Sequence, residues 1–190
     1  MAKIKKIKGR QVFDSRGNPT VEAEVFSDNG MSASAICPSG ASTGAYEAFE
    51  KRDGNKKKYL GKSVFKAIGL VNSIISRKLK NKNVHNQELI DALLINLDGT
   101  KQKSYLGANA ILAVSMAVKK LSAKIKKKPL YRTFLVKNNF KLPYPLMNII
   151  NGGAHANNGL RIQEFMIRPD RAKSFSEAMR ICFVVIKNLS

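Results

Sequence analysis

The sequence is sparing with cysteine and tryptophan: it has no tryptophan and two cysteines, Cys37 and Cys182, which lie far apart. Two distant thiols fit neither a disulfide framework nor the paired spacing of a zinc site, so we expect reduced cysteines in a cytoplasmic protein. Long apolar runs are also lacking, because the longest, residues 181–186, is far too short to cross a bilayer. The basic N-terminus is not followed by an apolar stretch of signal-peptide length. The sequence therefore predicts neither a secreted disulfide scaffold nor a protein with a membrane span.

Acidic residues are scarce as well. Aspartate and glutamate number 13 against 34 lysines and arginines, which gives a formal net charge of +21 at pH 7. Such a balance is typical of proteins that bind nucleic acid or an anionic surface. The basic residues are scattered, however, and aromatic residues do not alternate with them as in a base-stacking groove. A lysine-rich solvated surface is therefore favoured, and nonspecific binding of RNA or of an anionic surface remains the alternative.

The first part of the chain has the patterns of β-strands. Apolar residues flank a possible strand over residues 4–13, and apolar and polar residues alternate over residues 21–26. The turn-forming residues 28–30 separate this second strand from a third over residues 31–37. Because the connections are short, the three strands are predicted to form an antiparallel meander.

The middle of the chain has helical periodicity. Apolar residues recur at helical spacing over residues 64–75, 89–97 and 108–125, and Gly99 is positioned to end the second of these helices. Alanines in the third helix indicate close packing against a neighbour. Residues 1–140 are thus predicted to form an α+β domain in which a three-stranded antiparallel meander packs on a helical layer.

A second domain is predicted over residues 141–190. Continuous apolar runs at residues 146–150 and 165–167 are typical of strands buried on both faces. Ser174 and Glu177 have the spacing of a capping box, which predicts that a helix begins there. The order strand, strand, helix is only the start of a domain.

A loop rich in small residues follows the third predicted strand. Its backbone N–H groups and hydroxyls suit a flap that closes over an anionic or metal-bound ligand, although most such sequences are only turns. The predicted flap loop consists of Ser39, Gly40, Ala41, Ser42, Thr43 and Gly44.

Four segments, in this order, resemble the enolase family: residues 14–22, 38–48, 146–157 and 163–167. The resemblance implies an N-terminal α+β domain followed by a modified TIM-like barrel that is entered through two strands and then helices. A barrel of this kind needs about 250 residues. We therefore expect residues 141–190 to hold only the first strands and helix of an incomplete barrel.

The resemblance also implies a reaction, the reversible Mg²⁺-dependent dehydration of 2-phosphoglycerate to phosphoenolpyruvate in glycolysis, catalysed by a hydro-lyase. In this reading His155 and Glu164 are catalytic residues beside the substrate and its leaving hydroxyl, and Gln163 contacts the substrate. Ser42 would bind the second Mg²⁺ through its oxygens, which suits a hard cation.

Family members are homodimers, and the matching Arg10 and Glu22 imply contacts between subunits. The family is cytoplasmic and is also described on cell surfaces. The same resemblance places the catalytic lysine, the proton-donor glutamate and the ligands of the first Mg²⁺ beyond residue 190, so activity of this chain alone is not expected. Asn157 and Arg161 stand where the family usually has acids. The alternatives are an inactive remnant of an enolase and a basic fragment that binds anions or RNA.

Overall fold

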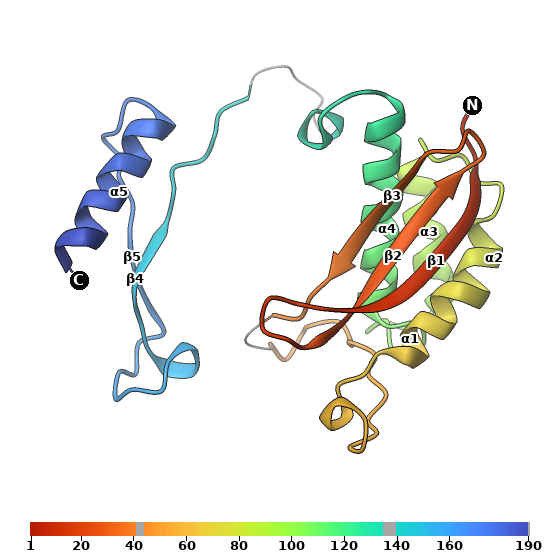
Figure 1. Ribbon diagram of the computed structural model, residues 1–190, viewed down its shortest axis with the longest axis horizontal. Helices are drawn as coiled ribbons and strands as arrows, with labels where there is room; N and C mark the ends of the chain where they lie inside the picture. The colour runs from red at the N-terminus through yellow and green to blue at the C-terminus, as the bar shows by residue number, and fades with distance from the viewer. Residues whose placement is uncertain (41–43, 135–139, 190) are drawn as a thin grey trace. The chain divides into compact units, whose positions relative to one another are not determined.

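The computed structural model describes residues 1–40, 44–134 and 140–189, and it divides into two compact units. Unit 1 is Met1–Leu135 and unit 2 is Val136–Ser190 (Figure 1). The division lies near the predicted domain boundary between residues 140 and 141, which stays a prediction.

Unit 1 contains a three-stranded antiparallel sheet in the order β1-β2-β3. The strands are β1 (Ile4–Phe13), β2 (Pro19–Ser27) and β3 (Ser32–Cys37). Alternation along β2 buries Val21, Ala23 and Val25 completely on one face, as a half-buried strand requires. The predicted meander is confirmed.

Helices cover the apolar face of this sheet (Figure 1). A first, nearly continuous helical stretch comprises α1 (Phe65–Leu70), the π-helix η2 (Val71–Ile75) and α2 (Ser76–Leu79). It is followed by α3 (Gln87–Asp98) and α4 (Ala108–Ile125). Two short 3-10 helices, η1 (Tyr59–Gly61) and η3 (Leu130–Thr133), complete unit 1.

Local residues explain where α3 begins and ends and why α4 packs closely. The Asn86 side chain accepts a hydrogen bond from the N–H of Leu89 and caps the start of α3. Gly99 has a φ of 67° and ends α3 in the left-handed conformation that favours glycine. Helix α4 packs against β2 and β3 and buries ten of its residues, several of them alanines, so its close approach to the sheet follows from small side chains.

Side chains from the helices meet both outer edges of the sheet. On β1, the backbone N–H of Gly9 donates to Oδ1 of Asn72 (2.7 Å), and Nδ2 of Asn72 donates to the carbonyl of Gly9 (3.2 Å). On β3, Nζ of Lys124 donates to the carbonyl of Ser32 (3.0 Å), and Lys120 reaches the carbonyl of Ser34 (3.2 Å). These contacts satisfy edge groups that would otherwise be available to another strand.

Unit 2 contains a two-stranded antiparallel hairpin and one long helix. The hairpin is β4 (Met147–Asn151) and β5 (Glu164–Ile167), joined by a loop that includes the 3-10 helix η4 (Gly153–His155). The helix is α5 (Phe175–Leu189). The predicted order of two strands and a helix is confirmed, and with unit 1 it gives the α+β fold expected for the start of an enolase-type barrel.

The capping box at the start of α5 is present in a modified form. The N–H of Glu177 donates to Oγ of Ser174 (3.1 Å), as predicted. The carboxylate of Glu177 accepts from the N–H of Lys173 (2.8 Å), one residue before the position that the motif usually engages. The start of α5 is therefore capped by side chains of its own segment.

The prediction that both hairpin strands are buried on two faces is wrong for this chain. Ile150 is 46% exposed, Phe165 39% and Met166 48%. Burial on both faces needs a covering layer on each side, and among the described residues of unit 2 the only long helix is α5.

Within the described ranges, no helix combines the length and apolar character needed to span a bilayer.

Candidate functional site

Two glycines shape the loop between β4 and β5. A Cβ atom on Gly152 would lie 2.3 Å from the carbonyl oxygen of Ile162, so only glycine fits there. Gly153 has a φ of +53°, in the left-handed region. The N–H of Gly152 donates to the carbonyl of Gln163 (2.9 Å), and that of Gly153 to the carbonyl of Leu160 (2.8 Å). The loop is thereby folded back on itself.

This fold-back brings the three predicted substrate-side residues together. Nδ1 of His155 lies 2.8 Å from Oε1 of Glu164, and Nε2 of Gln163 lies 2.6 Å from Nε2 of His155. Because the carboxylate accepts and the amide N–H donates, the contacts favour the imidazole tautomer that is protonated on Nδ1. The three side chains form a connected polar cluster at the end of the hairpin.

The cluster is open to a ligand. The side chains of His155 and Glu164 are 21% and 28% exposed, and Gln163 is exposed. A carboxylate that orients an imidazole is a common arrangement for binding a hydroxyl group or moving a proton. The geometry therefore suits recognition of a small polar substrate, and the assignment of His155, Gln163 and Glu164 as site residues stays a prediction.

The predicted flap loop is described only at its ends. The predicted Mg²⁺ ligand Ser42, together with Ala41 and Thr43, lies outside the described residues. Of the remaining members, Ser39 donates its hydroxyl to Glu50, and the N–H of Gly44 donates to Oε1 of Glu47 (2.9 Å).

The donor set offers no complete metal site in the part of the chain that the structure describes. No group of three or more histidine, cysteine, aspartate or glutamate side chains is placed to hold a metal ion there. Mg²⁺ needs several oxygen ligands in near-octahedral geometry. His155 and Glu164 are a pair only, so the described residues supply no cluster of three such ligands for Mg²⁺.

The residues predicted to contact a second subunit are paired within the chain. Arg10 donates to Oε2 of Glu22 (2.8 Å) and to Oε2 of Glu24 (2.9 Å). Partial burial alone would raise the pKa of Glu22, but the hydrogen bonds from Arg10 and Ser34 and the charge of Arg10 hold that pKa below its usual value. These residues thus form a surface ion-pair cluster on β1 and β2.

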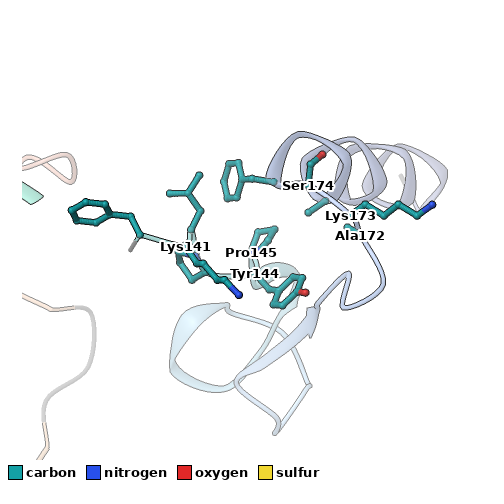
Figure 2. A pocket seen from close by; sticks show the side chains of 11 residues that line it. Lys141, Tyr144, Pro145, Ala172, Lys173 and Ser174 are labelled. Atoms are coloured by element: carbon teal, nitrogen blue, oxygen red, sulfur yellow. The ribbon is translucent and has the colours of Figure 1, made fainter. Parts of the chain in front are cut away.

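Figure 2 shows the open pocket of unit 2, which has a volume of about 400 Å³ and does not include the polar cluster. It lies between the segment 140–145 and the first turn of α5, and its charged lining residues are Lys141 and Lys173. The first turn of α5 beside the pocket is capped by Ser174 and Glu177.

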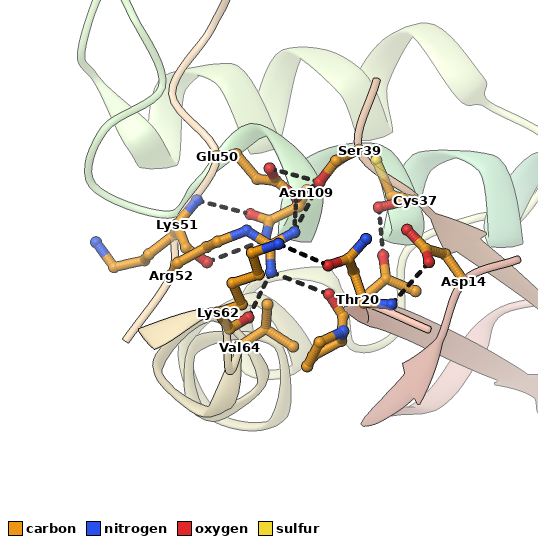
Figure 3. A network of polar contacts seen from close by, with 12 residues as sticks. Asp14, Thr20, Cys37, Ser39, Glu50, Lys51, Arg52, Lys62, Val64 and Asn109 are labelled. Atoms are coloured by element: carbon orange, nitrogen blue, oxygen red, sulfur yellow. Dashed lines mark hydrogen bonds and ion pairs between the residues drawn. The ribbon is translucent and has the colours of Figure 1, made fainter. Parts of the chain in front are cut away.

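Sequence reasoning missed a second polar network, which surrounds the start of the flap loop. Arg52 and Glu50 contact Ser39 (Figure 3). Arg16 contacts the backbone of the same residue. The only signal in the sequence is that charged residues follow a loop of small residues, and this is too common to single them out.

Comparison with known proteins agrees with the resemblance seen in the sequence. The family model described as "Enolase, N-terminal domain" matches residues 4–134, which is more than half of the chain, and "Enolase, C-terminal TIM barrel domain" matches residues 139–190. The protein named "Enolase" from Pelagibacter ubique (strain HTCC1062) is 79% identical over 189 residues, which cover 100% of this chain and 45% of the relative's length. The chain therefore belongs to the enolase family.

Proposed function

We propose that this chain supplies the N-terminal and substrate-side part of an enolase, a hydro-lyase that interconverts 2-phosphoglycerate and phosphoenolpyruvate. The observation that carries the proposal is the contact among His155, Gln163 and Glu164 in a chain that is 79% identical to a protein named "Enolase". Because the chain spans 45% of that relative, the activity is assigned to this chain only in company with the remaining barrel.

Glu164 and His155 act beside the hydroxyl that leaves the substrate. Glu164 accepts a hydrogen bond from the Nδ1–H group of His155 and thereby fixes the plane of the imidazole. The opposite ring atom, Nε2, is then the group that faces a ligand once the Gln163 amide is displaced from it. Gln163, freed by the same displacement, can donate to a substrate oxygen.

The family's Mg²⁺ would offset the negative charge that develops when a proton beside a carboxylate is removed. On the resemblance alone, Ser42 would contribute oxygen to the second ion. Since the described residues offer no further ligand cluster, we infer that Mg²⁺ binds tightly only when carboxylates from the rest of the barrel are supplied. A homodimer in the cytoplasm is inferred from the family in the same way, with the ion-paired surface of Arg10 and Glu22 at the subunit contact.

The test is a Mg²⁺-dependent phosphoenolpyruvate assay on the purified 190-residue chain, with and without a separately expressed C-terminal segment of the Pelagibacter relative. Activity is expected only when both are present. His155→Ala and Glu164→Gln should each lower kcat by about 10²–10⁴-fold. Asp170→Asn is the matched control, because Asp170 pairs with Arg168 on the surface of the same unit. No activity with the partner segment would overturn the proposal, and so would full activity without it.

The charge of +21 is the observation behind a second candidate function, the binding of polyanions. Arg77, Lys78, Lys80 and Lys82 line one open hollow on unit 1, where a phosphate backbone could be bound without base contacts. Binding to single-stranded RNA should then weaken steeply with salt and show little sequence preference. Salt-insensitive binding, or no binding at low salt, would remove this function.

A further inference from the structure

Arg52 lies at the centre of the polar network around the start of the flap loop (Figure 3). Its Nη2 donates to Oγ of Ser39 (2.7 Å) and to Oε1 of Glu50 (2.8 Å). Its Nη1 donates to the carbonyl of Pro19 (3.0 Å) and also to the carbonyl of Lys62. One guanidinium thus joins four segments, and only 21% of its side chain is exposed.

Ser39 is held by its neighbours at both its hydroxyl and its backbone. Its hydroxyl accepts from Arg52 and donates to the Glu50 carboxylate, whose two oxygens lie 2.6 and 2.7 Å away. Its carbonyl accepts from Nη2 of Arg16 (2.5 Å), which also reaches the carbonyl of Gly40 (3.2 Å). A residue restrained at hydroxyl and carbonyl has lost most of its conformational freedom.

The segment 14–20 also belongs to this polar network. Oδ1 of Asp14 accepts from the N–H groups of Arg16 and Asn18, both at 2.9 Å, which shapes the turn that carries Arg16. Nζ of Lys62 donates to Oδ1 of Asn18 (2.9 Å) on the same turn. The first of the four family segments is thereby tied to the second, through both arginines and through Ser39.

The contacts of residue 52 suit arginine better than lysine. Arginine presents five donors in a planar fork, so one side chain can serve two carbonyls, a hydroxyl and a carboxylate together. A lysine at residue 52 would keep the charge but would present a single nitrogen at one point. The interaction with Glu50 is charge-assisted as well, which makes it stronger than a neutral hydrogen bond.

We propose that Arg52 is a positioning residue that fixes Ser39 and, through the adjoining peptide bond, Gly40 at the start of the flap loop, in the geometry that the reaction needs. The inference rests on the proposed function for its catalytic consequence. Its structural part, the restraint of Ser39 and Gly40, stands independently of any activity.

The structural part is tested by ¹⁵N relaxation on the full chain. In the Arg52→Lys variant, the amide order parameters of Ser39 and Gly40 should fall from about 0.85 to below about 0.6, while those of β2 stay unchanged. Arg180→Lys is the matched control, because Arg180 is exposed on α5 and is not part of the network. Unchanged order at Ser39 and Gly40 would overturn the proposal. A uniform fall in the order parameters across unit 1, together with a lower Tm, would also overturn it. Arg52 would then stabilise the whole unit and would not position one segment.

A double-mutant comparison locates the contact that matters. Ser39→Ala removes the hydroxyl that Arg52 and Glu50 share. If the restraint runs through this hydroxyl, Arg52→Lys should change the order of Gly40 much less in the Ser39→Ala background than in the natural chain. Fully additive effects would contradict the assigned route.

The catalytic part is tested in the assay with the C-terminal segment. Arg52→Lys should lower kcat by about 10²-fold, as small misplacements of a positioned group do, and Arg180→Lys should leave kcat unchanged. If the natural chain is inactive with the segment, the proposed function fails and the relaxation result alone decides the positioning role. If the natural chain is active and Arg52→Lys matches it, the positioning role fails.

Discussion

Unit 1 has a core of large apolar side chains, whereas no large apolar side chain is fully buried in the described part of unit 2. In unit 1, strands and helices contribute to one buried cluster, in which Ile4, Val25, Leu94 and Leu121 are fully buried. In the described part of unit 2, the buried apolar residues are Ala172, Ala178 and Cys182. The larger side chains are partly or well exposed, and they include Leu146, Ile150, Ile162, Met179, Phe183 and Leu189.

The difference shows what a hydrophobic pattern means. A pattern states which face of an element is apolar, and burial follows only where another element covers that face. In unit 1 the cover comes from the same stretch of chain, since α4 packs on β2 and β3. In unit 2 the described residues do not supply it, so large apolar side chains stay exposed there.

The largest expected effect comes from truncating one large apolar side chain in each unit. Leu94→Ala, at a fully buried position of α3, should lower the free energy of unfolding by about 2–5 kcal/mol. Phe183→Ala, at a position that is 61% exposed on α5, should change it by less than about 0.5 kcal/mol. Urea unfolding at pH 7 measures both. A comparable loss for Phe183→Ala would show that unit 2 has a core after all.

The next prediction tests whether Gly152 shapes the loop between β4 and β5 in unit 2. Gly152→Ala places a Cβ against the carbonyl of Ile162 and should displace the loop, at a local cost of roughly 1–3 kcal/mol. Gly159 has open space around it and serves as the control in the same loop. The imidazole NMR signals of His155 should shift in Gly152→Ala and stay in place in Gly159→Ala. Unchanged signals in both would mean that the fold-back does not position the imidazole.

A pH-dependent effect is expected from Asp98 in unit 1. Burial alone would raise the pKa of Asp98, but hydrogen bonds from Thr100 and from the N–H of Leu106 outweigh it and lower the pKa below its ordinary value. The lowered pKa contributes stability that is present above about pH 4, the unfolded value, and is lost as the pH falls through the folded value.

Asp98→Asn should therefore cost about 1–3 kcal/mol at pH 7 and should flatten the fall of stability below pH 4. Urea unfolding from pH 7 to pH 2 gives both quantities. Asp170→Asn in unit 2, at an exposed pair, should leave the curve unchanged. An acid limb that is equally steep in Asp98→Asn would contradict the role of this carboxyl group.

The smallest effect concerns the lysines at the edge of β3. Lys120→Ala and Lys124→Ala each remove one hydrogen bond from an exposed ammonium to a carbonyl and should lower stability by about 0.5 kcal/mol or less. The thermal midpoint of each variant measures this. A loss well above 1 kcal/mol would mean that the aliphatic stems, rather than the hydrogen bonds, pack against the sheet.

Much of the fold could be predicted because it depends on local signals. The predicted helix over residues 108–125 coincides with α4, and Gly99 ends α3 as its φ allows. The contact of His155 with Glu164 was foreseeable only through the family segments, since it depends on the fold-back at Gly152. The network of Arg52 could not be foreseen, because it joins four segments whose meeting no local rule describes.

The bonds that Asn72, Lys120 and Lys124 make to the edges of the sheet in unit 1 have a consequence for self-assembly. Fibril growth needs a strand with free backbone groups on which identical strands can stack. Carbonyls on both edges of the three-stranded sheet are already engaged by side chains. The hairpin of unit 2 pairs β4 only with β5 among the described residues, so each of its strands keeps an outer edge, next to exposed Ile150 and Met166. If this chain forms fibrils, their protease-resistant core should contain residues 147–167 and leave the sheet of unit 1 intact.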